Sequence, residues 1–199
     1  RRCRVDVPLL ASSPSLVELA PTNREEYLAM LDWSLSYREH PVAIRVPVGV
    51  TLPATRPVPT NYSALNTYEV VERGKDVAIL ALGNFFSLGE RVCRLLEAHG
   101  IRATLINPRY ISGVDCDLLD SLATDHRLVV TLEDGALNGG FGEKIARHFG
   151  ATGVKTLCYG AKKQFADRYA PKEFLAANRL VDTMIVEDIM KHSQGKLER

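Results

Sequence analysis

From residue 67 onward, the apolar positions of this chain form short runs separated by segments with helical periodicity. Four nearly continuous apolar runs predict buried strands, at residues 77–82, 103–106, 128–132 and 154–158. Hydrophobicity that is continuous rather than alternating is typical of parallel strands covered on both faces. Because strands and helices alternate, the sequence predicts an α/β domain with a mostly parallel sheet.

Local capping signals predict where the helices begin and end. Ser87 and Glu90 fit a capping box, and Gly100 suits the position just after the same helix. Asp115 and Asp182 each precede an apolar periodic segment and suit helix N-caps.

The first part of the chain predicts an incomplete unit. Residues 22–25 fit a second capping box, which opens a predicted helix over 24–37, and residues 42–46 predict a short strand. One helix and one strand cannot bury a core, so we expect residues 1–50 to end a domain that needs upstream sequence. The chain does not begin with Met, and we expect it to be part of a longer protein.

One stretch, residues 131–142, combines features that can bind an anion. Glu133 and Asp134 follow an apolar run, and Gly139, Gly140 and Gly142 form a turn before a predicted helix. A helix start offers free N–H groups to an anion. However, the turn lacks the Lys-Ser/Thr of a P-loop and does not fit G-x-G-x-x-G. Close packing of the helix explains the glycines better than phosphate binding does.

Charged residues gather where the parallel strands should end, which is where ligands of open α/β sheets bind. Arg109 follows one strand, and Glu133 and Asp134 follow another. These residues could form a binding site. Alternatively, Arg109 and Glu133 or Asp134 could neutralise each other at a domain or subunit contact. We favour the contact, because nothing among these residues is a specific motif.

Composition excludes several classes of function. The 199 residues are 46% hydrophobic and carry a net charge of +1, which gives no field of the kind that nucleic-acid-binding proteins show. The apolar runs are too short to cross a bilayer, so we expect neither a nucleic-acid partner nor a membrane. Four scattered cysteines fit a reducing cytoplasm.

Metal and nucleophile motifs are missing as well. No His lies within metal-ligand spacing of another His or a Cys. We interpret His99, His126 and His148 as surface residues at helix ends. The residues alone therefore predict no metal site and no self-sufficient active site.

Several stretches, taken in order, resemble the end of the transketolase superfamily. They are Ala20-Pro21-Thr22-Asn23, the segments 43–49 and 74–83, Glu133-Asp134, and Gly139-Gly140-Phe141-Gly142. Each motif is loose, but their order and spacing are together fairly specific. The chain looks most like the 1-deoxy-D-xylulose-5-phosphate synthases.

This resemblance implies an architecture. Residues 1–50 would end a pyrimidine-binding domain, 51–66 would be a linker, 67–192 a transketolase C-terminal domain, and 193–199 a tail. The C-terminal domain would be a three-layer α/β/α unit. Its five-stranded sheet would be mostly parallel with one antiparallel edge, for which residues 68–72 are our candidate.

The resemblance also implies thiamine diphosphate and Mg²⁺ as cofactors of a homodimeric parent enzyme that joins pyruvate and glyceraldehyde 3-phosphate with decarboxylation. The family's Gly-Asp-Gly segment and its activating glutamate lie upstream in relatives, so we expect no cofactor and no catalysis from this chain alone.

Two departures from the family concern the arginine for the substrate phosphate and the active-site histidine. The arginine that binds substrate phosphate in relatives is Val48 here, and the family's His-Gln-Gly falls on residues 1–3. Arg45 and Arg109 keep family positions and are our substrate-binding candidates. Glu133, Asp134 and the three glycines are our interface candidates.

Two hypotheses follow. The chain is the C-terminal part of a thiamine-diphosphate enzyme of the transketolase type, with an acceptor that could differ because of Val48. Alternatively, it is a non-catalytic assembly or regulatory module of a transketolase-like protein.

Overall fold

The predicted five-stranded sheet is present, with its strands in the order β3-β5-β4-β6-β7. A computed structural model describes residues 6–10, 13–46, 52–162 and 171–194. The strands of the main sheet are β3 (Glu69–Glu72), β4 (Asp76–Ala81), β5 (Thr104–Asn107), β6 (His126–Ala136) and β7 (Lys155–Ala161). The strands β4 to β7 pair in parallel, and only the edge strand β3 is antiparallel to its neighbour, which confirms the predicted sheet.

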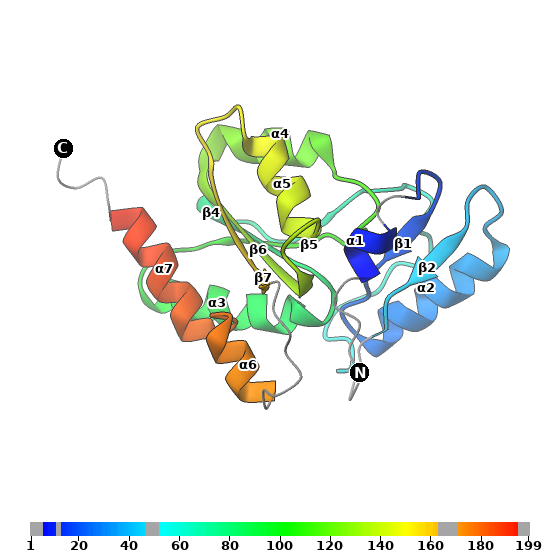
Figure 1. The fold of residues 1–199 in the computed structure, drawn as a ribbon, viewed down its shortest axis with the longest axis horizontal. Coiled ribbons are helices and arrows are strands. Elements are labelled where there is room, and N and C mark those ends of the chain that lie inside the picture. The colour runs from blue at the N-terminus through cyan, green and yellow to red at the C-terminus, as the bar shows by residue number, and fades with distance from the viewer. Residues whose placement is uncertain (1–5, 11–12, 47–51, 163–170, 195–199) are drawn as a thin grey trace.

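Helices cover both faces of this sheet, with α4 and α5 on one side and α3 and α7 on the other (Figure 1). The helices of this domain are α3 (Phe86–Ala98), α4 (Cys116–Asp125), α5 (Phe141–Phe149), α6 (Pro171–Ala177) and α7 (Asp182–Gln194), and a 3-10 turn, η1 (Gly83–Phe85), precedes α3. The three layers that the pattern predicted are therefore confirmed.

Alternate residues of strand β4 belong to the two hydrophobic layers on opposite faces of the sheet. On β4, Ala78 and Leu80 pack with the α4 and α5 side, whereas Val77 and Ile79 pack with the α3 and α7 side. Because side chains alternate across a strand, a strand buried on both faces must be apolar at every position. This explains the continuous runs in the sequence.

A smaller unit lies at the carboxyl ends of the parallel strands (Figure 1, blue and cyan). It consists of α1 (Asp6–Leu10), β1 (Val17–Leu19), α2 (Arg24–Ser36) and β2 (Val42–Ile44), with β1 and β2 paired in parallel. Its apolar residues are continuous with one layer of the main core, and Leu19 bridges to Tyr110.

The proline-rich segment that follows also packs against its surroundings. The Trp33 indole N–H donates to Ser63 Oγ (3.2 Å), and Tyr110 Oη donates to the Tyr62 carbonyl (2.6 Å). Two hydrogen bonds from α2 and from the loop after β5 therefore position the second half of the predicted linker.

The capping predictions have mixed outcomes. Asp115 caps α4 by accepting from the Leu118 N–H (3.0 Å), and Gly100 takes a positive φ after α3, both as predicted. The box at Ser87 is wrong, because α3 continues directly from η1 and begins at Phe86 without a side-chain cap.

The box at residues 22–25 is wrong by one residue. Asn23 is the N-cap of α2 and accepts from the Glu26 N–H (2.8 Å). Glu26 then reaches back to the Thr22 N–H (2.7 Å), which completes a reciprocal cap.

Candidate site at the carboxyl ends of the strands

Glu133 supplies the anion that the start of α5 requires. The strand β6 continues past the predicted end at residue 132 to Ala136, so Glu133 lies inside the strand and is 1% exposed. Its carboxylate accepts from the N–H groups of Phe141 (3.0 Å) and Gly142 (2.8 Å). These are two of the free donors at the start of α5. The position where an anion could have bound is therefore filled by the chain's own carboxylate.

The glycines of the turn make this arrangement possible. A Cβ on Gly140 would lie 2.6 Å from a Glu133 carboxylate oxygen and 2.4 Å from the Ala136 carbonyl oxygen. A Cβ on Gly142 would lie 2.6 Å from the Thr131 hydroxyl, so α5 can approach β6 closely only with glycine there. Gly139 has a φ of +70° and packs against Pro8 of α1. The close packing predicted for the glycines is present.

Arg45 ties the small unit to the end of β6. Its guanidinium binds the Asp6 carboxylate in two places (2.6 and 3.3 Å) and donates to the Asp134 carbonyl oxygen. The Asp134 carboxylate accepts from Asn84 Nδ2 (3.1 Å). The predicted substrate-binding arginine Arg45 thus contacts the predicted interface residue Asp134 inside one chain.

Arg109 pairs with carboxylates other than the two that the sequence suggested. Its Nε lies 3.2 Å from Glu26 and its Nη2 lies 2.7 Å from Glu69, and the Arg109 side chain is 15% exposed. Neither Glu133 nor Asp134 is among these partners. Glu26 is also held by Asn107 Nδ2 (3.1 Å), so a polar cluster joins α2, β3 and the end of β5.

Two carboxylates in this region are costly to ionise. Burial raises the pKa of Glu133 to about 7, against the lowering effect of its two N–H bonds. Burial and the charge of Asp6 raise the pKa of Glu18 on β1 to about 7, although Lys144 and Arg45 lower it. Burial lowers the pKa of Lys144, whose ammonium donates to the Ile111 carbonyl (2.6 Å).

Several residues of this region were not predicted from the sequence to belong to the site. Glu18 carried a signal, because it is the only charged residue in the apolar run 16–20. Glu26 would have been found by placing the N-cap at Asn23. Asp6 and Asn84 carried no local signal, because their partners lie far along the chain.

The interpretation of His126 as a surface residue is wrong. Its side chain is fully buried at the start of β6, between Asp125 (2.5 Å) and Thr104 (2.7 Å). Of the residues singled out from the family comparison, Val48 and residues 1–3 lie outside the described residues.

The described residues do not fit the cofactors that the resemblance implies. Within the described ranges, no three His, Cys, Asp or Glu side chains are grouped to hold a metal ion. Arg45 and Arg109, the cations predicted to bind substrate here, are already engaged by carboxylates. We therefore derive no chemical step through thiamine diphosphate or Mg²⁺ on this chain.

Comparison with known families identifies the domain. The family model described as the transketolase C-terminal domain matches residues 66–185. The chain belongs to this family.

Relatives of this transketolase-family chain include 1-deoxy-D-xylulose-5-phosphate synthases. The enzyme of Gloeothece citriformis is 32% identical over 192 residues, which cover 94% of this chain and 30% of the relative. A Synechococcus enzyme is 32% identical over 200 residues, again covering 30% of the relative. This chain therefore spans about a third of the length of the curated relatives that it matches.

Solved structures agree on the fold. A protein described as a split gene transketolase, inactive beta4 tetramer, superposes with a TM-score of 0.77 at 25% identity and covers 96% of this chain and 61% of that one. A transketolase of Pichia stipitis superposes with a TM-score of 0.72 at 13% identity, covering 98% of this chain and 28% of that one. Among the described residues, none of the helices is long and apolar enough to span a membrane.

Proposed function

We propose that this chain is the C-terminal part of a thiamine-diphosphate-dependent enzyme of the transketolase type, which resembles 1-deoxy-D-xylulose-5-phosphate synthase. In this proposal residues 1–50 end the pyrimidine-binding domain and residues 67–192 form the C-terminal domain. The observation that carries the proposal is the likeness to the synthases along almost the whole chain, including the small unit.

The geometry supports a structural role for the chain inside such an enzyme. The buried carboxylate of Glu133 fixes the start of α5, and the ion pairs of Arg45 and Arg109 hold the small unit on the strand ends. These contacts would set the position of the pyrimidine-binding domain, while residues outside this chain hold the cofactor.

The small unit also has a surface suited to further protein. Leu28, Leu31 and Leu35 follow one side of α2 and are 54%, 38% and 67% exposed, whereas Met30 and Trp33 face the core. Two paired strands rarely form a stable sheet alone. We infer that the remainder of the pyrimidine-binding domain covers these leucines.

The test is to express the chain together with the coding sequence immediately upstream. We expect decarboxylation of pyruvate in the presence of glyceraldehyde 3-phosphate, dependent on thiamine diphosphate and Mg²⁺. A combined protein that folds but neither binds the cofactor nor decarboxylates pyruvate would overturn the proposal.

The alternative is a non-catalytic assembly module, which one observation favours. The split-gene relative is described as an inactive tetramer, and this chain covers 61% of it. Under this alternative the purified chain forms defined oligomers in light scattering, and replacing Leu28, Leu31 and Leu35 by Ser makes it monomeric. A wild-type chain that is monomeric at all concentrations would rule the alternative out.

A further inference from the structure

A basic groove lies at the amino-terminal ends of the parallel strands, at the opposite end of the sheet from Glu133. Its volume is about 860 Å³, within the range of pockets that hold small molecules. Five Lys and Arg side chains line it, together with His192: Arg73, Lys75, Arg102, Arg127 and Lys155. Among the described residues that line it, Asp76 is the only acidic one. This local excess of positive charge contrasts with a net charge of +1 for the whole chain.

Three of these cations are available to a ligand. Within the described part of the chain, Lys75, Arg102 and Lys155 have no ion-pair partner and no side-chain hydrogen bond. Arg127 lies 3.7 Å from Asp76, and both of these side chains are mostly exposed, so that pair is weak. Lys75, Arg102 and Lys155 come from three separate segments, before β4, before β5 and at the start of β7, and the fold brings them to one groove.

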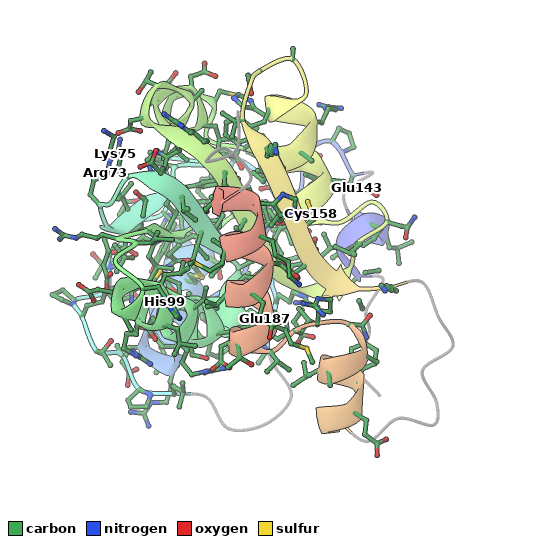
Figure 2. All side chains as sticks on the ribbon, turned by 90° about the vertical axis from the view of Figure 1, so that its left-hand side faces the viewer. Arg73, Lys75, His99, Glu143, Cys158 and Glu187 are labelled. Atoms are coloured by element: carbon green, nitrogen blue, oxygen red, sulfur yellow. The ribbon has the colours of Figure 1, made fainter. Side chains whose placement is uncertain are left out.

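A buried network holds the loop that carries Lys75. The Gly74 N–H donates to Thr104 Oγ1 (2.9 Å), and this hydroxyl contacts Nε2 of the buried His126 (2.7 Å). His126 Nδ1 meets Asp125 (2.5 Å), which also binds Arg73 (3.1 Å). Figure 2 shows Arg73 and Lys75 side by side on this loop. These hydrogen bonds fix the loop in the protein without ligand. Binding a ligand therefore costs less conformational entropy of the loop.

Gly74 brings this loop close to the segment before β5. A Cβ there would lie 2.0 Å from the Arg102 carbonyl oxygen, and the Lys75 N–H donates to that same oxygen (3.0 Å). Lys75 and Arg102 are thus held on neighbouring backbone segments. Ile101 adds an apolar wall to the groove.

We propose that this groove binds a small polyanion that carries a triphosphate group. Several separated cations match a chain of phosphates better than one point charge, because each oxygen can accept a charge-assisted hydrogen bond. The volume of about 860 Å³ leaves space beside the phosphates for an organic group such as a nucleoside, and Ile101 offers that group an apolar contact. Glu133, Arg45 and Arg109, whose contacts support the proposed function, do not line this groove.

The test is calorimetric titration of the 199-residue chain with inorganic tripolyphosphate, adenosine triphosphate and inorganic phosphate. We expect saturable binding of the two triphosphates, much weaker binding of phosphate, and affinity that falls as ionic strength rises toward about 0.15 M. Tighter binding of adenosine triphosphate than of tripolyphosphate would show that the nucleoside also contacts the groove, at Ile101. Equal binding would show that the groove recognises the phosphates alone.

Matched variants decide whether the groove is responsible. We expect Lys75→Gln combined with Lys155→Gln to weaken tripolyphosphate binding by about tenfold or more. The control, Arg91→Gln combined with Arg147→Gln, makes the same change in net charge elsewhere and should leave the affinity within about twofold. Thermal unfolding checks that both variants fold, and the single variant Arg102→Gln replaces the groove variant if that one does not fold.

Equal weakening by both double variants would show that the attraction is only a net-charge effect and would overturn the proposal. So would the absence of saturable triphosphate binding by the folded wild-type chain.

Discussion

Replacing Glu133 by Gln tests the balance between burial and hydrogen bonding at the start of α5. The carboxylate is buried and receives two N–H bonds, yet burial outweighs those bonds and raises its pKa from 4.5 to about 7. A carboxyl group whose pKa is higher in the folded state stabilises the fold most at low pH. That stability is lost as the pH rises from the unfolded pKa, near 4.5, through the folded pKa, near 7.

The expected magnitude follows from the size of the shift. One pKa unit corresponds to about 1.4 kcal/mol, so the full shift is worth about 3.4 kcal/mol. Between pH 5 and pH 8 about 2.5 kcal/mol of this should disappear from the wild-type protein. The Glu133→Gln variant cannot ionise at this position. Its stability relative to wild type should therefore improve by about that amount over the same range.

The assay is urea unfolding of both proteins at pH 5, 6, 7 and 8. Glu97→Gln is the matched control, because it makes the same chemical change at an exposed position of α3, away from Glu133, and its effect is subtracted at each pH. If Glu133→Gln instead becomes more destabilising toward pH 8, the two N–H bonds outweigh burial and the reasoning is refuted.

Three further predictions concern the same region. The Glu18→Gln variant should gain stability relative to wild type as the pH rises from 5 to 8, because burial also raises the pKa of Glu18 to about 7; a flat difference in urea unfolding would contradict this. Replacing Arg109 by Met should cost about 3 kcal/mol, since it leaves a buried carboxylate without its cation, whereas Arg91→Met at an exposed pair should cost under about 1 kcal/mol; equal losses would be the contrary result. Gly142→Ala should destabilise by about 1–3 kcal/mol, because its Cβ would lie 2.6 Å from a hydroxyl oxygen of β6, while Gly153→Ala, with open space around it, should be nearly neutral in thermal unfolding.

The sheet was predictable because its cause is local and repeated. A strand covered on both faces must be apolar at every position, and the runs at residues 77–82 and 128–132 report this directly. The antiparallel edge at β3 came from the family resemblance, and the pairing of Glu69 with Asn107 bears it out. Helix starts were predictable where the cap was a single side chain, as at Asp115. They failed at Ser87, where the chain enters α3 through a 3-10 turn that no cap signal marks.

The sequence could not predict which residues the charged side chains pair with. Arg109 pairs with Glu26, 83 positions earlier, because the fold places α2 beside the end of β5. The sequence suggested Glu133 or Asp134 only because they follow another of the predicted parallel strands. His126 was misjudged for the same reason: its burial depends on Thr104, which belongs to another strand.

The sequence by itself determined the alternation of strands and helices, the family, and the position of the stretch 131–142 between a strand and a helix. Only the tertiary structure decided what that stretch does with its charges. The Glu133 carboxylate turns back to the start of α5 because Gly140 leaves space for it, and that places the chain's own anion where a ligand could have bound. Such an outcome depends on distances of a few ångströms between backbone segments, which the order of residues does not encode locally.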